Sequence, residues 1–228
     1  GILGKKAIVC ASSKGLGFGC AIALANAGVN LTMCARNKEV LELASDKIKK
    51  TGVQVNAVSC DITTSDGIEK VLEVMPNPDI LINNAGGPPP GSWEDWTKDD
   101  FQSAIQANML TPINLIQRVL PGMIKNKWGR IVNITSGAVK APIPALGLSN
   151  TARAGLTGFV AGVSRQVASD GVCINNVLPG VHDTDRIKVF DETMAKNLNI
   201  SIEEARRKKA MSIPAGRYGD SEGFGNTC

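Results

Sequence analysis

The feature of this sequence that most restricts its fold is an alternation of short apolar runs with longer amphipathic segments. Several of the runs are apolar through most of their length, as expected for strands that helices cover on both faces. The alternation therefore predicts an α/β Rossmann fold, a doubly wound parallel sheet of six strands with helices on both faces. The predicted strands are Ala7–Cys10, Asn30–Cys34, Val53–Val58, Ile80–Ile82, Arg130–Ile134 and Cys173–Leu178. The predicted helices are Phe18–Ala27, Lys38–Thr51, Thr64–Met75, Lys98–Asn126 (one helix or two) and Ser149–Ala168.

The length of 228 residues, without repeats or low-complexity tracts, predicts a single domain over 1–228. Gly28 and Gly52 fall just after predicted helices, where a left-handed C-terminal cap is common. No apolar stretch approaches the roughly 20 residues that span a bilayer. The sequence also starts without a charged-then-apolar leader. We therefore expect a cytoplasmic protein with no membrane partner.

Charge and cysteine usage argue against two classes of function. A net charge of +4 is too small to indicate nucleic-acid binding, and the basic run Arg206–Lys209 fits a solvated helix face. The six cysteines form no CxxC pair and His182 is the only histidine, so no metal site is expected. Cys10, Cys34 and Cys60 fall within or at the ends of apolar runs, where we expect reduced, buried thiols.

A glycine-rich turn follows the first predicted strand directly and opens the first predicted helix. Gly15 and Gly17 allow close backbone approach, and a helix N-terminus offers free N–H groups and partial positive charge to a pyrophosphate. Its place between the first strand and the first helix makes it a predicted dinucleotide-binding turn. The expected cofactor contacts are Ala11, Ser13, Lys14, Gly15, Leu16 and Gly17.

The second predicted strand runs into a positively charged residue, at the position where an acidic residue would favour NAD. A carboxylate there would hydrogen-bond the ribose hydroxyls, whereas Arg36 can pair with the 2′-phosphate of NADP. Lys14 in the glycine turn adds a second positive charge nearby. We therefore predict NADP(H) as the cofactor; if Arg36 is only a surface arginine, the preference stays open.

Two more strand ends predict cofactor contacts. The third strand runs into Asp61, which can accept from the adenine amino group, and Ile62, which can cover the ring. The fourth ends in Asn83–Gly86, whose small residues let the backbone lie close to a ribose. From this segment the expected contacts are Asn83, Ala85 and Gly86.

These motifs resemble the short-chain dehydrogenase/reductase family over nearly the whole chain, and within it the 3-oxoacyl-carrier-protein reductase group. The segment Cys10–Gly17 is similar to the family's TGxxxGxG turn except at Cys10 and Ala11, a mild change if the φ of Ala11 stays negative. Asn83–Gly86 matches the family's NNAG. The resemblance implies further site residues: Asn108 as the active-site asparagine, Ser136 as the catalytic serine, and Pro179, Gly180 and Thr184 around the nicotinamide carboxamide.

The chain departs from the family at its YxxxK element. By resemblance, Ser149 occupies the tyrosine position and Arg153 the lysine position, and Ala154–Gly158 continues the expected helix. A serine hydroxyl has a far higher pKa than a phenol activated by lysine. Arg153 stays protonated, so it is a poor proton source, although it can hold the nicotinamide ribose and stabilise negative charge. Loss of a positioned general acid typically costs about 10²–10⁴ in rate.

Three hypotheses about function follow. The first is an NADPH-dependent reductase of a 3-oxoacyl-like or other ketone, whose proton arrives through water, Ser149, Lys140 or His182. The second is a reductase of an activated C=C or C=N bond, which needs little acid help. The third is an NADP(H)-binding sensor or structural protein without useful turnover. We favour the first, an oxidoreductase with an atypical active site.

By resemblance, the helical segment 185–213 covers a small-molecule substrate. The run that contains Pro142, Pro144, Leu146 and Leu148 either lines a partly apolar pocket or packs within its loop.

The predicted helix from Ser149 carries Gly155, Gly158 and Gly162, although each interior glycine costs about 1 kcal/mol relative to alanine. Such a small-residue face suits a closely packed partner helix. By resemblance the partner is a second copy, in a homodimer or homotetramer; packing within one subunit is the alternative. Relatives usually continue past the position of Cys228 into a seventh strand, which we expect to be missing here.

Overall fold

Six parallel strands form one sheet in the computed structural model, which describes residues 1–228, in the order β3-β2-β1-β4-β5-β6. The predicted fold class is therefore confirmed, and each predicted strand is present with ends shifted by no more than a few residues. The strands are β1 (Lys6–Val9), β2 (Asn30–Ala35), β3 (Val55–Ser59), β4 (Ile80–Asn83), β5 (Gly129–Ile134) and β6 (Val172–Val177). The longer helices are α1 (Gly15–Asn26), α2 (Lys38–Lys49), α3 (Ser65–Val74), α4 (Lys98–Ile105), α5 (Thr111–Lys125), α6 (Gly147–Val167), α7 (Asp185–Leu198), α8 (Ile202–Met211) and α9 (Ser221–Thr227).

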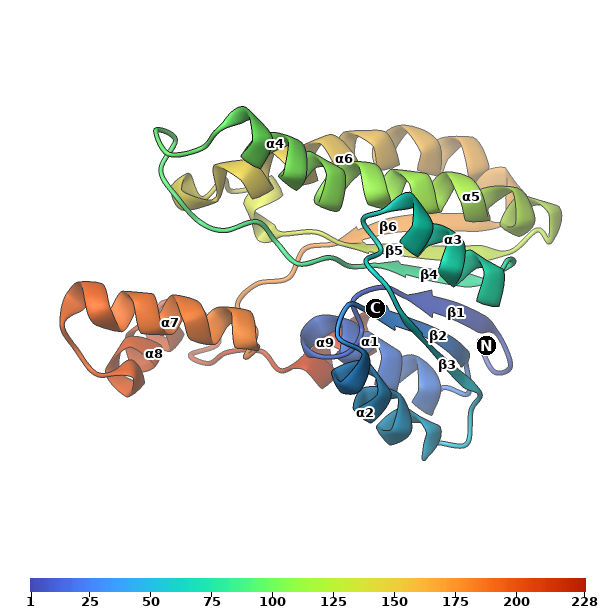
Figure 1. Ribbon diagram of the computed structural model, residues 1–228, viewed down its shortest axis with the longest axis horizontal. Helices are drawn as coiled ribbons and strands as arrows, with labels where there is room; N and C mark the ends of the chain where they lie inside the picture. The colour runs from blue at the N-terminus through green and yellow to red at the C-terminus, as the bar shows by residue number, and fades with distance from the viewer.

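Helices cover both faces of the sheet, as Figure 1 shows. Successive side chains of a strand point to opposite faces, so β1 contributes to two separate cores. Ala7 and Val9 pack with side chains from α1, α2 and α9. Ile8 packs on the other face with side chains from α3, α5 and α6. This double coverage explains why the strands are apolar through most of their length.

The sheet order reverses between β1 and β4, which lie side by side at its centre. In an open parallel sheet such a switch point leaves a crevice at the carboxyl ends of the strands, where ligands bind. The glycine turn follows β1 and the Asn83–Gly86 segment follows β4 at this edge. The fold thus places the predicted nucleotide motifs together.

The region predicted as one or two helices over Lys98–Asn126 forms three elements. A π-helix, η1 (Gln106–Leu110), separates α4 from α5. A π-helical turn inserts one extra residue per turn, a change that hydrophobic periodicity does not reveal. The predicted left-handed caps are confirmed at Gly28, with φ 79°, and at Gly52, with φ 90°.

Cysteine burial follows the sequence prediction in part. Cys10 and Cys34 are free and buried, whereas Cys60 is only half-buried. No helix of the chain is long and apolar enough to cross a membrane.

The helices α7 and α8 project from the body of the molecule, drawn in orange at the left of Figure 1. They pack against each other, and α9, which the sequence did not predict, then returns the chain to α1. A Cβ atom at Gly19 would collide with the backbone oxygen of Ser221, so these two helices touch through their backbones.

Candidate functional site

The glycine turn places an uncapped helix N-terminus at the carboxyl end of β1. Lys14 occupies the N-cap position of α1, its side chain makes no capping hydrogen bond, and the first turn of the helix holds no acid. Gly15 has φ 59°, in the left-handed region. A Cβ atom at Gly17 would collide with the Ala11 carbonyl oxygen. The free N–H groups can therefore hydrogen-bond a phosphate, which the helix dipole also favours. Because the two glycines have no side chain, a phosphate can approach the backbone closely.

The condition under which alanine would be a mild change at position 11, a negative φ, is not met, because the φ of Ala11 is 46°. A left-handed conformation costs a residue with a Cβ roughly 1–2 kcal/mol. Two contacts hold it in place: Ser12 N donates to Cys34 O at 3.1 Å, and Asn84 Nδ2 donates to Ala11 O at 3.2 Å. Asn84 thus joins the turn to the end of β4, a role that the sequence reasoning missed although its NNAG motif was recognised.

The adenosine side of the crevice carries the expected charges. Arg36 is exposed directly after β2. Asp61 accepts from Thr63 N at 2.9 Å and from Thr63 Oγ1 at 2.8 Å. These bonds lower the pKa of Asp61, with a smaller contribution from the positive charge of Arg36. Ile62 beside it is buried. The corner therefore offers an ionised acceptor and a free guanidinium.

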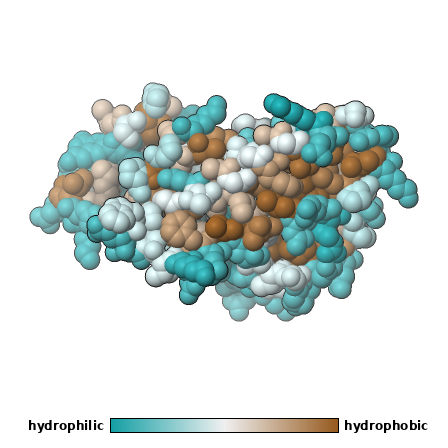
Figure 2. Space-filling view, turned by 90° about the horizontal axis from the view of Figure 1, so that it is seen from above, coloured by the Kyte–Doolittle hydropathy of each residue, from teal (hydrophilic) through white to brown (hydrophobic).

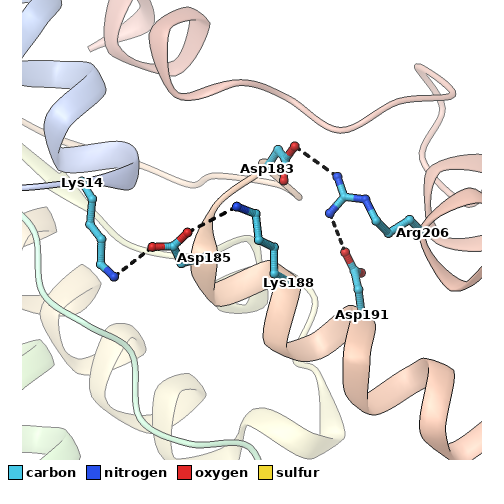
Figure 3. Close-up of polar contacts among 6 residues, drawn as sticks. All are labelled: Lys14, Asp183, Asp185, Lys188, Asp191 and Arg206. Carbon is cyan, nitrogen blue, oxygen red and sulfur yellow. Dashed lines mark hydrogen bonds and ion pairs between the residues drawn. The ribbon is translucent and has the colours of Figure 1, made fainter. Parts of the chain in front are cut away.

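Lys14 has a partner that the sequence reasoning did not identify. Its Nζ lies 2.9 Å from Asp185 Oδ2 on the first turn of α7. Figure 3 shows this pair, with Lys188 on the other oxygen of Asp185 at 3.4 Å. The glycine turn and α7 are thus joined by an exposed ion pair.

A second group of ion pairs holds α7 and α8 together. Arg206 of α8 lies 3.1 Å from Asp183 and 3.0 Å from the buried Asp191 of α7 (Figure 3). Tyr218 Oη donates to Asp191 at 2.8 Å. Burial and the neighbouring Asp191 raise the pKa of Tyr218 to about 12. The only tyrosine of the chain thus has a structural contact with α7.

Asparagines connect the carboxyl ends of the central strands. Asn83 Nδ2 donates to Asn133 Oδ1 at 2.8 Å, and Asn133 Nδ2 donates to Asn176 Oδ1 at 3.0 Å. Asn108, on the π-helix, is buried and donates to Gly86 O at 3.4 Å. Its Oδ1 is buried without a partner. Asn83, Asn108 and Arg153 all line one small cavity of about 10 Å³ at this edge.

Ser149 and Arg153 lie one turn apart on α6 and bind each other. Arg153 Nε donates to Ser149 Oγ at 3.2 Å and Nη1 donates to Ile134 O at 2.8 Å. Both side chains are buried. Burial lowers the pKa of Arg153 to about 10, with a smaller contribution from the charge of Arg186, so it is still a cation at neutral pH. The Ser149 oxygen accepts from Arg153, which leaves its own proton free to donate.

The remaining predicted site residues surround the same edge. Ser136 is half-buried after β5, and its Oγ accepts from Ala138 N at 3.1 Å. Pro179 O accepts from Gly137 N at 3.4 Å. Thr184 precedes α7 without a side-chain cap bond, and its methyl group is 3.6 Å from a Cβ built on Gly15. Thr184 thus lies over the glycine turn.

Other sequence candidates lie differently. The ring of His182 stacks edge-on against Phe224, with ring centroids 5.2 Å apart. Leu148 lines a second cavity of about 140 Å³, whereas Pro142 and Pro144 are exposed. The predicted pocket lining is therefore supported for Leu148 alone.

The reversed strand order, the uncapped helix and the crevice define the class of protein, a Rossmann-type dinucleotide-binding oxidoreductase. The comparisons give the family. Residues 5–195 match the short chain dehydrogenase family, so the chain belongs to the short-chain dehydrogenase/reductase family, as the sequence predicts.

Named relatives are reductases. The chain is 32% identical over 223 residues to the 3-oxoacyl-[acyl-carrier-protein] reductase FabG of Vibrio cholerae, covering 95% of this chain and 85% of that protein. The L-sorbose reductase of Gluconobacter frateurii, solved with NADPH and L-sorbose, is 25% identical with a TM-score of 0.93, covering 100% and 89%. The actinorhodin polyketide ketoreductase solved with NADPH is 26% identical with a TM-score of 0.91, covering 98% and 88%.

Proposed function

We propose that this chain is an NADPH-dependent reductase that transfers hydride to a carbonyl, either 3-oxoacyl-like or another ketone, with a non-standard proton supply. The observation that carries the proposal is the meeting, at one sheet edge, of an uncapped helix N-terminus with Arg153 and Ser149. The solved relatives with NADPH bound support the choice of cofactor. NADPH supplies the hydride when bound.

The residues of the chain divide the remaining work. Lys14, Arg36 and the amides after Lys14 bind the phosphates, and Asp61 binds the adenine. Ser136 donates a hydrogen bond to the substrate oxygen. Arg153, a cation within the site, stabilises the negative charge that develops on this oxygen. The proton reaches this oxygen from water by way of the Ser149 hydroxyl.

A second candidate is the reduction of an activated C=C or C=N bond. It is favoured by the residues around the two cavities, among which only Asp100 and Arg153 can ionise. The Asp100 carboxylate accepts from Thr97 N at 2.8 Å and from Thr97 Oγ1 at 2.7 Å in a capping box, where it supports α4. Neither group is a suitable acid at neutral pH, and an enone or iminium needs less acid help than a ketone.

The test follows NADPH oxidation against a panel of ketones, 3-oxoacyl thioesters and enones, with cofactor binding measured in parallel. Turnover of ketones or thioesters supports the carbonyl reductase. Turnover of enones alone supports the second candidate. Tight binding of NADPH with no turnover on any of them would instead identify an NADP(H)-binding sensor.

We also propose that two copies associate through α6 and that α7 and α8 cover the substrate. Gly155 packs within its own subunit, because a Cβ atom there would collide with Met109 Sδ. Gly158 and Gly162 instead face open space. Figure 2 views the molecule from the side on which α4, α5 and α6 lie in Figure 1, and shows hydrophobic surface through the middle with hydrophilic side chains toward the ends. A reducing cytoplasm fits the six free cysteines.

A further inference from the structure

Arg186 on the first turn of α7 reaches across to the segment that follows β4. Its Nη1 donates to Gly87 O at 2.6 Å and its Nη2 donates to Pro88 O at 2.8 Å. A Cβ atom at Gly87 would lie 2.8 Å from Arg186 Nη2, so the glycine makes room for the guanidinium. The side chain is exposed. Two of its five N–H donors are thus used, and the others stay accessible to a ligand.

Arg186 differs from its charged neighbours because it has no acidic partner. Lys14 and Lys188 share Asp185, and Arg206 has both Asp183 and Asp191 (Figure 3). No ion pair involves Arg186, whose guanidinium contacts only carbonyl oxygens and the face of Phe190, 5.5 Å from the ring centroid. Its charge is therefore not neutralised within the chain.

The carbonyls that hold Arg186 belong to the wall of the larger cavity. Gly87 and Pro88 line the space of about 140 Å³, together with Asn108. Asn108 also lines the smaller cavity beside Arg153. The positive charge of Arg186 contributes to lowering the pKa of Arg153, so the two guanidinium groups act on each other. The one acid on the wall, Asp100, is engaged by Thr97.

We propose that Arg186 forms a carboxylate subsite, so that the substrate reduced at the Arg153 end of the cleft carries a carboxylate bound by Arg186. This inference rests on the proposed function and narrows its substrate to oxo acids or unsaturated acids. A guanidinium binds a carboxylate through two parallel hydrogen bonds, and an anion would relieve the repulsion between the two arginines. The phosphates of NADPH are the other source of negative charge, and the experiment separates the two.

The experiment compares acids with their methyl esters: acetoacetate, 4-oxopentanoate and 4-oxo-2-pentenoate. Binding of each to protein saturated with NADP⁺ is measured by calorimetry, and kcat/KM for NADPH oxidation is measured alongside. We expect the wild-type protein to prefer at least one acid over its ester by about tenfold or more. Arg186→Gln should reduce this ratio to near one, and Arg186→Lys should restore part of it.

The matched control is Lys188→Gln, which removes the same charge from the same helix but from a side chain that is paired with Asp185. It should keep the acid preference. Equal binding of acid and ester by the wild type overturns the subsite, as does an equal loss for both in Arg186→Gln. If Arg186→Gln weakens the affinity for NADPH, the charge of Arg186 binds the cofactor phosphates and not a substrate carboxylate. If acids bind selectively but are never reduced, the result supports the subsite and contradicts the proposed function.

Discussion

Ser149 and Arg153 lie one turn apart on α6, joined by a hydrogen bond of 3.2 Å, and we propose that they stand in place of the tyrosine and lysine of the family motif. The consequence is chemical, because the site keeps a buried cation but has no group that releases a proton near neutral pH. At the scale of single residues, the most informative experiments therefore concern proton supply and charge.

Restoring the family's pair should accelerate carbonyl reduction. In Ser149→Tyr combined with Arg153→Lys, a phenol beside an ammonium regains the role of general acid, which is worth about 10²–10⁴ in rate. We expect kcat for ketone reduction to rise at least tenfold, measured by NADPH oxidation. Arg153→Lys alone is the control and should give no rise. A folded double variant without any gain would show that proton transfer is not limiting or that Ser149 does not occupy the tyrosine position.

The cofactor preference should depend on Arg36. Arg36→Ala removes the free guanidinium at the end of β2, and loss of a charge-assisted hydrogen bond to the 2′-phosphate costs about 1.5–3 kcal/mol. NADPH should therefore bind roughly 10–100-fold more weakly while the Kd for NADH stays the same, measured by cofactor fluorescence. An equal loss for both cofactors would assign Arg36 a structural role.

The pH dependence should lack a break near neutrality. Burial lowers the pKa of Arg153 only to about 10, so its charge is constant between pH 6 and about 9. Tyr218, with a pKa raised to about 12, also keeps its proton throughout this range. We expect kcat to be flat from pH 6 to about 9 in a buffered series with saturating NADPH. A clear inflection within this range would instead implicate another acid.

At the scale of elements, the π-helix η1 and the first turn of α7 hold the site together. The π-helix η1 turns Asn108 inward, where its amide donates to Gly86 O. The first turn of α7 brings Asp185 to Lys14 and Arg186 to Gly87. The helix α7 is therefore attached to both sides of the switch point, the turn after β1 and the segment after β4.

The ion pair between α7 and the glycine turn should oppose cofactor binding. Lys14 and Asp185 have side-chain exposures of 66% and 59%, so the pair is worth only roughly 0.2–1 kcal/mol. Asp185→Asn releases Lys14 for the cofactor phosphates, and the Kd for NADPH should fall by about two- to fivefold at low salt. Asp183→Asn is the matched control, since its partner is Arg206. Unchanged or weaker binding in Asp185→Asn would contradict this competition.

At the scale of the whole molecule, the exposed face of α6 is the surface on which association can be tested. Ala154, Gly158, Ala161 and Gly162 are all exposed there, and a Cβ atom at Gly158 meets nothing within 4 Å. A side chain at this position therefore has room in the folded subunit.

Gly158→Glu should therefore convert an oligomer to a monomer while the circular dichroism spectrum is retained. A buried, unpaired carboxylate would be placed in the proposed helix–helix contact, which is strongly unfavourable. Sedimentation velocity provides the measurement, with Gly158→Ala as the control that should stay associated. If the wild-type chain is monomeric, or if Gly158→Glu associates equally well, the interface lies elsewhere.

The sequence by itself determined the sheet and the edge at which the motifs meet. Apolar runs separated by amphipathic helices can bury their side chains only as a parallel sheet covered on both faces, and its carboxyl ends then gather the residues that follow each strand. The glycine turn, Arg36, Asp61 and the Asn83–Gly86 segment could be predicted in this way. Periodicity and strand ends carry this information locally along the chain.

Only the tertiary structure decided which side chains meet across the crevice. The positive φ of Ala11, the Lys14–Asp185 pair and the π-helical turn at Asn108 all depend on contacts with other elements. Arg186 and Gly87, bound to each other, are 99 residues apart in the sequence. No local pattern encodes such a contact, because it arises only when the packed sheet brings α7 over the segment after β4.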